Sequence, residues 1–232
     1  MLAVNADMEA RVVVDTAAMS WQPSPSETVW RKRLHLLGEQ ESAQVTSIVR
    51  YDPGATFPAH DHPDGEEILV LEGVFSDEHG DWGVGSHLLN PQGFRHAPFS
   101  REGCVIFVKL QQYAGRGRRH QSVQSELLEW RRGDADGVRL RRLYQQHGFP
   151  ESIDIENWHP GTSVSRDYPG GVEIFVIDGS LSDSGVSFGP GTWLRLPAGT
   201  RITLLSTDGC TFYSQRGAIP SLLSSSKERG AG

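Results

Sequence analysis

The chain contains 232 residues, of which 37% are hydrophobic and 22% are charged, and its 26 glycines and 13 prolines supply many turn positions. Its formal net charge of -7 argues against a general binder of nucleic acid or anionic membranes, because such proteins need clustered positive charge. It has neither a run of about 18 apolar residues nor a signal-peptide pattern, so we expect a cytoplasmic protein that does not span a membrane.

Short runs rich in β-branched and aromatic residues recur between clusters of glycine, proline, asparagine and aspartate. In the first half they occupy residues 11–15, 44–51, 67–73, 86–90 and 104–110. In the second half they occupy residues 137–144, 173–179, 192–197, 201–205 and 210–214. This spacing of short strands and turns is typical of an antiparallel sandwich or barrel. The sequence therefore predicts an all-β fold.

The second set of runs repeats the first at a constant offset of 106 residues, the difference between Glu173 and Glu67. The same offset relates several turn residues and both cysteines: Gly73 and Gly179, Asp77 and Asp183, Gly85 and Gly191, Pro91 and Pro197, Gly93 and Gly199, Gly103 and Gly209, Cys104 and Cys210. Chance would rarely keep turn glycines and prolines in one register, so we predict two structurally equivalent modules. The cysteines lie in apolar runs and are expected to be reduced, buried thiols.

Residues 111–136 separate the two modules. They include the basic stretch RGRRH, which is interpreted as a solvated linker surface, and a segment in which Val123, Leu127 and Trp130 fall on one helical face. We therefore predict one short amphipathic helix here. The small, polar residues after 217 are expected to be disordered.

Two histidines and a glutamate in the first module share one strand parity: His60, His62 and Glu66. Residues two apart in a strand point to the same face, and a turn at HPDG lets the chain reverse between the histidines and the carboxylate. His96 follows a P-x-G turn and is expected to join them from a neighbouring strand. Three imidazoles and one carboxylate suit Fe(II), Mn(II), Ni(II), Co(II) or Zn(II). The alternative is that His60 and His62 are exposed loop residues with no common target.

The spacing of these residues matches both motifs of the cupin superfamily. The first motif, G-x5-H-x-H-x3-E-x6-G, runs from Gly54 to Gly73, and the second, G-x5-P-x-G-x2-H, runs from Gly85 to His96. Residues 51–110 look most like the cupin domain of ChrR-type anti-sigma factors, notably in GEEILVLEGVFSDEHGDW and HAPFSREGCVIFVKL. The resemblance covers each half of the chain. It implies a bicupin, which consists of two tandem double-stranded β-helix, or jelly-roll, barrels.

The expected organisation follows from the repeat and the resemblance together. Residues 1–112 form an N-terminal cupin with a metal site, 113–136 a linker with a short helix, 137–217 a degenerate C-terminal cupin, and 218–232 a disordered tail. The ligands are assigned as His60, His62, Glu66 and His96. Either Glu66 or Glu67 can be the fourth ligand; parity and family spacing favour Glu66, which leaves Glu67 outward or structural.

The second module is not expected to bind metal. Adding 106 to the four ligand positions gives Arg166, Tyr168, Val172 and Ile202. None of these side chains is a neutral imidazole or a carboxylate, so the prediction is one divalent ion per chain, with zinc, iron, manganese and nickel as the candidates. The second module is then a scaffold, an interface or a lid.

Two functions are weighed for the metal. The first is a ChrR-like module that binds or senses a small molecule, and the second is an Fe(II)-dependent dioxygenase that acts on a diketone or hydroxyketone. A metal-free sugar-nucleotide isomerase is disfavoured by the intact ligand set. ChrR-type proteins carry a separate anti-sigma domain with an H-x3-C-x2-C motif, which this sequence lacks, so a sigma-factor partner is not expected. A small-molecule ligand is expected, as is a homodimer if the N-terminal strands pair between chains.

Overall fold

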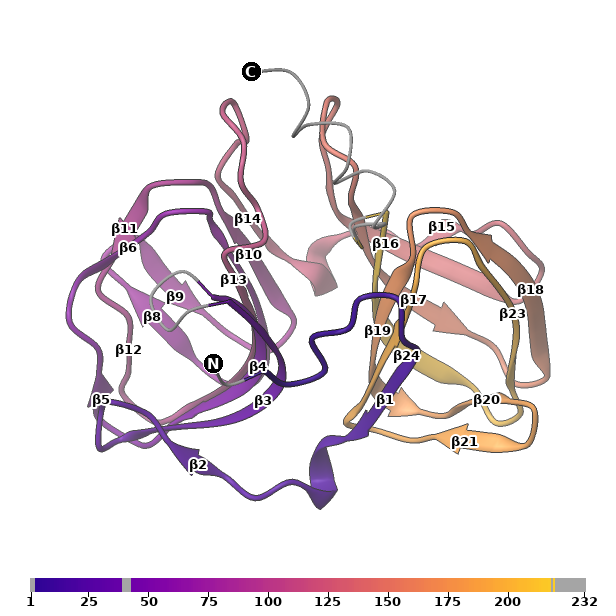
Figure 1. Cartoon of the computed structure of the whole chain (residues 1–232), viewed down its shortest axis with the longest axis horizontal. Coiled ribbons are helices and arrows are strands. Elements are labelled where there is room, and N and C mark those ends of the chain that lie inside the picture. The colour runs from indigo at the N-terminus through magenta and orange to yellow at the C-terminus, as the bar shows by residue number, and fades with distance from the viewer. Residues whose placement is uncertain (1–2, 39–42, 218, 220–232) are drawn as a thin grey trace. The chain divides into compact units, whose positions relative to one another are not determined.

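The structure is a computed structural model that describes residues 3–38, 43–217 and 219. The chain divides into two compact units, one built from Met1–Ala6 and Ala18–Leu127 and the other from Asp7–Ala17 and Leu128–Gly232. Both units are β-structured, which confirms the predicted all-β fold (Figure 1). The tail expected at residues 218–232 lies outside the described residues, except for Ile219.

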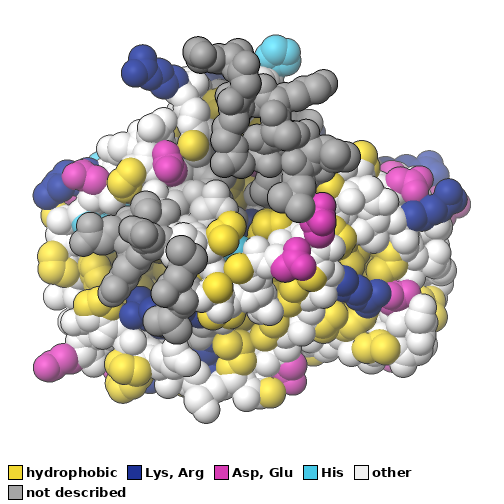
Figure 2. Space-filling model, in the orientation of Figure 1, with side chains coloured by type: hydrophobic (Ala, Val, Ile, Leu, Met, Phe, Trp, Pro, Cys, Tyr) yellow, Lys and Arg dark blue, Asp and Glu magenta, His cyan; other side chains and the backbone are white. Residues whose placement is uncertain are grey.

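Within the described ranges, no helix has the length and apolarity needed to cross a membrane. On the face drawn in Figure 2, basic and acidic side chains are interspersed and do not gather into a field of one sign.

A large sheet and two smaller ones enclose the core of the first unit. Its strands are β2 (Gln22–Pro23), β3 (Val29–Leu37), β4 (Gln44–Tyr51), β5 (Ala55–Thr56), β6 (His60–His62), β7 (Glu66–Gly73), β8 (Phe75–Asp77), β9 (Gly80–Trp82), β10 (Ser86–Asn90), β11 (Phe94–His96), β12 (Phe99–Ser100), β13 (Cys104–Leu110) and β14 (Gln121–Gln124). The large sheet has the order β14-β10-β7-β13-β4-β3-β2, and the others are β11-β6 and β5-β12-β8-β9. Ile68 and Val108 of the large sheet share one buried cluster with Ala55 and Phe75, so the sheets pack face to face.

The second unit repeats this arrangement. Its strands are β1 (Val12–Asp15), β15 (Arg131–Arg132), β16 (Val138–Gln145), β17 (Ser152–Trp158), β18 (Thr162–Tyr168), β19 (Val172–Gly179), β20 (Leu181–Asp183), β21 (Val186–Phe188), β22 (Thr192–Leu196), β23 (Thr200–Ser206) and β24 (Cys210–Arg216). The sheets are β1-β22-β19-β24-β17-β16-β15 and β18-β23-β20-β21. The repeat read from the sequence therefore corresponds to two equivalent jelly rolls. Both cysteines are buried and free, as expected.

Two strands belong to the unit that the sequence order does not suggest: β1, near the N-terminus, joins the second unit, and β14, in the linker, joins the first. Val12–Asp15 of β1 pairs antiparallel with β22, and Gln121–Gln124 of β14 pairs with β10 in the equivalent place. Figure 1 labels β14 and β10 side by side. Whereas residues 1–112 were expected to form one domain, Asp7–Ala17 thus belongs to the second unit. Each pairing covers an edge of a large sheet and removes a row of open backbone groups.

The linker contains a helix of only three residues, and the amphipathic face predicted for it is not formed. The segment forms β14, a 3-10 helix η2 at Ser125–Leu127, and β15. A second 3-10 helix, η1 (Thr16–Ala18), follows β1. Val123 pairs with His87 in the sheet, and Leu127 is 77% exposed, so these residues do not share one buried helical face. The ladder formed with β10 satisfies backbone groups that a helix as short as this could not stabilise alone.

Two prolines interrupt the small sheet of the first unit beside the histidines. In the second unit β18 and β23 are continuous, and Val164 pairs with Leu204. The equivalent residues 106 positions earlier are Pro58 and Pro98, where the first unit breaks into β5 and β6 on one side and β11 and β12 on the other. Proline has no N–H to give to a ladder, so the sheet parts here and leaves Pro58 O available to a side chain.

Candidate metal centre and its cavity

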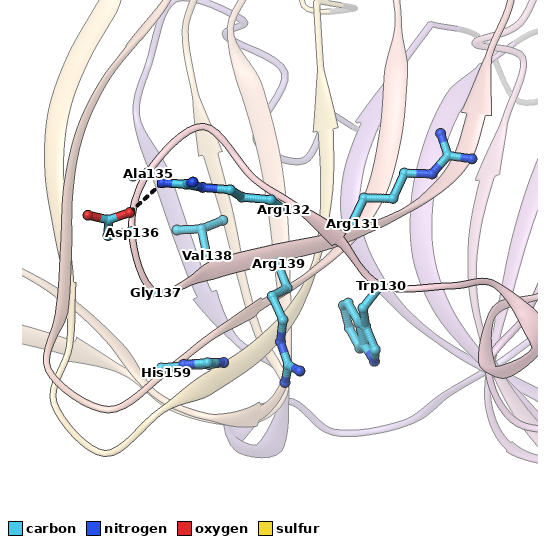
Figure 3. A pocket seen from close by; sticks show the side chains of 9 residues that line it. All are labelled: Trp130, Arg131, Arg132, Ala135, Asp136, Gly137, Val138, Arg139 and His159. Atoms are coloured by element: carbon cyan, nitrogen blue, oxygen red, sulfur yellow. Dashed lines mark hydrogen bonds and ion pairs between the residues drawn. The ribbon is translucent and has the colours of Figure 1, made fainter.

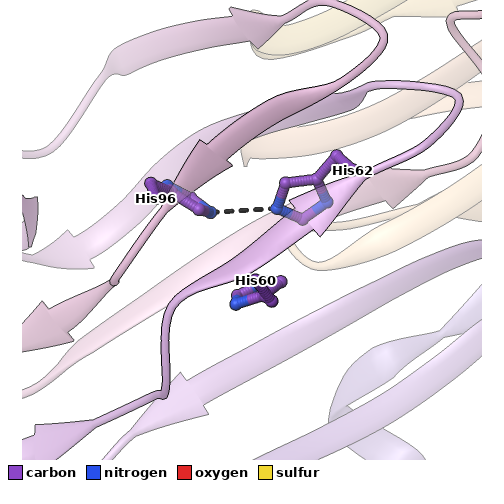
Figure 4. A group of neighbouring side chains, drawn as sticks. All are labelled: His60, His62 and His96. Atoms are coloured by element: carbon purple, nitrogen blue, oxygen red, sulfur yellow. Dashed lines mark hydrogen bonds between the residues drawn. The ribbon is translucent and has the colours of Figure 1, made fainter.

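Three histidines gather where β6 and β11 run side by side. His60 and His62 lie on β6, His96 lies on β11, and His96 is the cross-strand partner of His60. One ring nitrogen from each lies within 4.8 Å of the others (Figure 4). His62 Nε2 and His96 Nε2 are 3.0 Å apart. The three rings therefore converge on one point, although they come from positions up to 36 residues apart.

Two of these rings are held with Nε2 toward the common point. His60 Nδ1 lies 2.8 Å from the carbonyl of Pro58, and His96 Nδ1 lies 3.1 Å from Asp77 Oδ2. Both partners are acceptors, so each Nδ1 carries the proton and donates it, which leaves Nε2 with a free lone pair. A carboxylate or carbonyl behind a histidine is the usual way to fix the tautomer of a metal ligand.

Glu66 completes the cluster from the start of β7. Its Oε2 lies 3.3 Å from His62 Nε2 and 3.4 Å from His96 Nε2, and the same oxygen accepts a hydrogen bond from Asn90 Nδ2 at 2.9 Å. An ion with bonds of about 2.0–2.2 Å to nitrogen and oxygen places neighbouring ligand atoms roughly 3–3.5 Å apart. The spacing of these donor atoms therefore fits a divalent transition metal.

The charge states of the cluster also suit a cation. Burial, reinforced by the charges of His96 and His60, lowers the pKa of His62 to about 3, so its imidazole is neutral at pH 7. Burial raises the pKa of Glu66, opposed by His96 and by the Asn90 hydrogen bond. Burial alone would lower the pKa of His96, but the hydrogen bond to Asp77 and the charge of Glu66 raise it. A bound cation would offset the burial of the Glu66 carboxylate.

Glu67 lies on the opposite face of β7 and has a different set of partners. Its side chain is fully buried and accepts hydrogen bonds from His87 Nε2 at 2.9 Å and from the Tyr113 hydroxyl. Burial would raise the pKa of Glu67, but these bonds and the His87 and Lys109 charges lower it. The expectation that Glu67 is structural fits, whereas an outward position does not, since its exposure is 0%.

The second module has a buried glutamate with the same structural role as Glu67. Glu173, the equivalent of Glu67, accepts a hydrogen bond from Trp193 Nε1 at 3.1 Å, and Trp193 is the equivalent of His87. Each module thus ties its central strand to the neighbouring strand through a buried carboxylate. Sequence reasoning missed His87 as this partner, although the shared offset links the two pairs.

The positions equivalent to the metal cluster are filled by core and ion-pair residues in the second module. Val172 and Tyr168 belong to its hydrophobic cluster, together with Ile202. Arg166, at the place of His60, forms ion pairs with Glu156 at 2.8 Å and with Asp134. No group of metal-binding side chains occurs among the described residues of this module.

Removal of the Glu156 charge is expected to destabilise the second unit in a pH-dependent way. Burial would raise the pKa of Glu156, but Arg216 and Arg166 lower it below the ordinary 4.5. The stabilisation is therefore complete above the unfolded pKa and is lost as the pH falls through the folded value. Glu156→Gln should cost about 3–5 kcal/mol at pH 7, because it leaves the buried Arg166 and the half-buried Arg216 short of a partner.

Chemical denaturation of wild type and Glu156→Gln at pH 7 and in acid measures this effect. The difference between them should shrink on acidification. Asp167→Asn removes an exposed carboxylate that lies 3.7 Å from Arg201 and should leave both curves unchanged. A difference in unfolding free energy that is equal at both pH values would show that the Glu156 side chain stabilises the unit through packing and not through its charge.

The candidate metal-binding group of the first unit, His60, His62, Glu66 and His96, lies beside a cavity of about 860 Å³. His60, His62 and Glu66 line it on one side, and apolar side chains of β3, β4 and β13 line much of the rest. A cavity of this size accommodates a small organic molecule. One side of the metal cluster is therefore reachable by a ligand.

The second unit has a smaller pocket, of about 260 Å³, at the hairpin of β15 and β16. Figure 3 shows Trp130, Arg139 and His159 on its wall, with Arg132 paired to Asp136 at 2.7 Å. His159 is exposed and has no second metal-binding group beside it among the described residues. This pocket does not repeat the metal site of the first unit.

Loss of the Asp77 carboxylate is expected to weaken metal binding without abolishing it. Asp77 is buried and holds the His96 ring from behind, so Asp77→Ala should reduce metal affinity about 10–100-fold. Competition with a chelator of known affinity measures the change. Asp81→Ala, on the neighbouring strand, removes a carboxylate that is 58% exposed and should not alter it. Equal metal affinity in wild type and Asp77→Ala would show that the hydrogen bond to Asp77 does not position His96.

A family model described as the ChrR cupin-like domain matches the chain twice, over residues 9–114 and 118–220. No curated protein matches the sequence. The two matches together span nearly the whole described chain and fall on the two modules of the repeat.

Solved structures share the fold at low sequence identity. A candidate dioxygenase from Nostoc punctiforme PCC 73102 is 16% identical with a TM-score of 0.75, covering 92% of this chain and 85% of that one. The bacterial pirin YhhW from Escherichia coli, in complex with nickel(II), is 14% identical with a TM-score of 0.67, covering 91% and 100%. An oxalate decarboxylase from Bacillus subtilis is 11% identical with a TM-score of 0.62, covering 89% and 77%. At these identities the likeness concerns the fold.

Proposed function

Because the chain belongs to the ChrR cupin-like family and brings three histidines together in its first module, we propose that it binds one divalent metal ion through His60, His62, Glu66 and His96. The observation that carries the proposal is the convergence of these side chains beside a ligand-sized cavity: donor atoms of His62, His96 and Glu66 lie 3.0–3.4 Å apart, and the ligand nitrogen of His60 lies within 4.8 Å of those of the other two histidines. Three neutral imidazoles and one carboxylate leave a divalent ion with net positive charge. The ion would then attract an anionic or polar group of a ligand.

The function that we propose for this site is the binding or sensing of a small molecule. The protein groups have distinct tasks: Pro58 and Asp77 orient two rings, Asn90 fixes Glu66, and the apolar wall excludes water from the ligand. The second module, whose equivalent positions are filled, then acts as a scaffold. The donor set suits zinc, iron, manganese and nickel as the ion.

Metal analysis of protein purified without added metal tests the proposal. We expect one ion per chain, removable by a chelator and restored by a single equivalent. A protein that neither contains nor takes up a stoichiometric ion would contradict it.

A second candidate function is an Fe(II)-dependent dioxygenase for a diketone or hydroxyketone. It is favoured by the cavity, which borders His60, His62 and Glu66 and so gives a substrate access to the ion. Iron of higher coordination number would keep open positions beside four protein ligands, whereas four-coordinate zinc would not. Oxygen consumption by the Fe(II)-loaded protein with a panel of β-diketones and hydroxyketones separates the two functions. Stoichiometric zinc in the purified protein and no oxygen uptake after iron loading would eliminate the oxygenase.

A further inference from the structure

The cavity of the first unit has two cationic residues on an otherwise largely apolar wall. Arg31 and Arg33 lie two apart on β3, so both side chains point to the inner face of the large sheet, and both line the cavity. Both are half-buried. Lys32 between them faces the other way, where its Nζ lies 4.5 Å from the centre of the Trp21 ring.

Neither arginine has a carboxylate partner among the described residues. Arg31 Nε is buried without a hydrogen-bond acceptor, and Arg33 makes only a long contact of 3.4 Å to Gln22 Oε1. By contrast, three other arginines of the same unit pair with aspartates: Arg50 with Asp52, Arg95 with Asp61, and Arg101 with Asp81.

The carboxylates on the cavity wall are already engaged elsewhere. Asp61 lies 3.2 Å from Arg95, and Glu66 lies against His62 and His96. Burial, and secondarily the charge of Arg33, lower the pKa of Arg31. Two half-buried guanidinium groups with no carboxylate partner in the part of the chain that the structure describes repel each other, and an anion in the cavity would relieve this cost.

The strand register gives the distance between these arginines and the metal cluster. Glu66, Leu110, Val45 and Leu36 form one row across strands β7, β13, β4 and β3. Ile68, Val108, Ser47 and Arg33 form the next inward-facing row. Arg33 is thus three strands from Glu66, about 14 Å across the curved sheet at about 4.8 Å per strand, and one inward-facing row away along the strands.

The wall between the two polar ends is mostly apolar, with the Ser47 hydroxyl as a polar exception. Val45, Val49, Val108 and Leu110 line the cavity between β3 and β7. A ligand that touches both ends must therefore be elongated, with an apolar body and a polar group at each end.

We infer that this cavity binds an elongated carboxylic acid, whose carboxylate is held by Arg31 and Arg33 while its far end reaches toward the metal cluster. The planar fork of a guanidinium matches a carboxylate with two parallel hydrogen bonds, which a hydroxyl cannot reproduce. The inference names the ligand class for the site and, for the far end, rests on the proposed metal function.

Calorimetric titration of the metal-free protein with sodium octanoate and with octan-1-ol tests the carboxylate end alone. The metal must be removed first, because a bound ion would itself attract a carboxylate. The acid should bind about 10–100-fold more tightly than the alcohol, as expected for charge-assisted hydrogen bonds. Equal binding of the two, or no binding of octanoate, would overturn the inference.

Substitutions of Arg31 and Arg33 test whether these residues cause the preference for octanoate over octan-1-ol. Arg31→Gln with Arg33→Gln should reduce octanoate binding to the level of the alcohol, whereas Arg31→Lys with Arg33→Lys should keep part of the preference. Lys32→Gln removes the same charge from the opposite face of β3 and should keep all of it. Retained preference in the double glutamine variant, or equal loss in Lys32→Gln, would contradict the inference.

Metal content of the same variants separates this inference from the proposed function. The double glutamine variant should retain one ion per chain, because neither arginine is a proposed ligand and both lie three strands from Glu66 in the large sheet. If the wild-type protein binds no metal, the metal proposal is wrong. The inference about the carboxylate is then still tested by the octanoate titration. Circular dichroism and thermal unfolding establish that each variant is folded.

Discussion

Replacement of His60 and His62 together by alanine is expected to abolish metal retention while the protein stays folded. Two of the four proposed ligands are lost, and the remaining pair, His96 and Glu66, cannot hold a divalent ion against a chelator. The fold should survive because the hydrophobic cluster of the first unit includes neither histidine. Elemental analysis after chelator treatment and reloading measures retention, and circular dichroism measures folding.

The matched control is the double change His147→Ala and His159→Ala. It removes the same number of imidazoles from exposed positions in the second unit, where no cluster of metal-binding groups is present among the described residues. It should leave metal content unchanged. One ion per chain in the His60 and His62 double variant would place the site elsewhere.

The convergence of the candidate ligands could be predicted from the sequence because their spacing follows strand geometry. Two histidines separated by one residue point the same way in any strand, and this parity held in β6. Asp77 could not be found in the same way, since its approach to His96 depends on how β8 and β11 come together in space. Asp183 at the equivalent position pairs with Arg11, so even the repeat gave no hint of its role.

The pairing of β1 and β14 with distant strands and the absence of the expected amphipathic linker helix from the described residues have a common physical cause. Residues 121–130 carry apolar positions at a spacing that also fits a helix, and so short a segment has little preference of its own. Its conformation is decided by an open sheet edge on β10, which only the folded structure provides. Likewise, the sequence Arg31-Lys32-Arg33 does not indicate which of the three cationic side chains face a cavity; the structure places Arg31 and Arg33 on its wall.

Substitution of Gly73 by alanine is expected to destabilise the first unit by about 3–4 kcal/mol. Gly73 has a φ of +68°, which strains any other residue, and an added Cβ would lie 2.1 Å from the carbonyl oxygen of Gly103. That oxygen is backbone beside the ladder between Gly73 and Cys104, so it cannot move aside cheaply. Gly54→Ala isolates the conformational cost, about 1 kcal/mol, because its φ is +78° and nothing lies within 4 Å of its Cβ.

The same change in the second module separates the fold from the metal site within one chain. Gly179 has a φ of +71°, and its added Cβ would meet the Gly209 oxygen at the same 2.1 Å. Gly179→Ala should therefore cost as much stability as Gly73→Ala, but it should leave metal retention intact at temperatures where the first unit is folded. Thermal unfolding and metal release measured on the same sample distinguish Gly73→Ala from Gly179→Ala. Equal early metal release from both would mean that the modules unfold as one unit and that the second stabilises the metal site of the first.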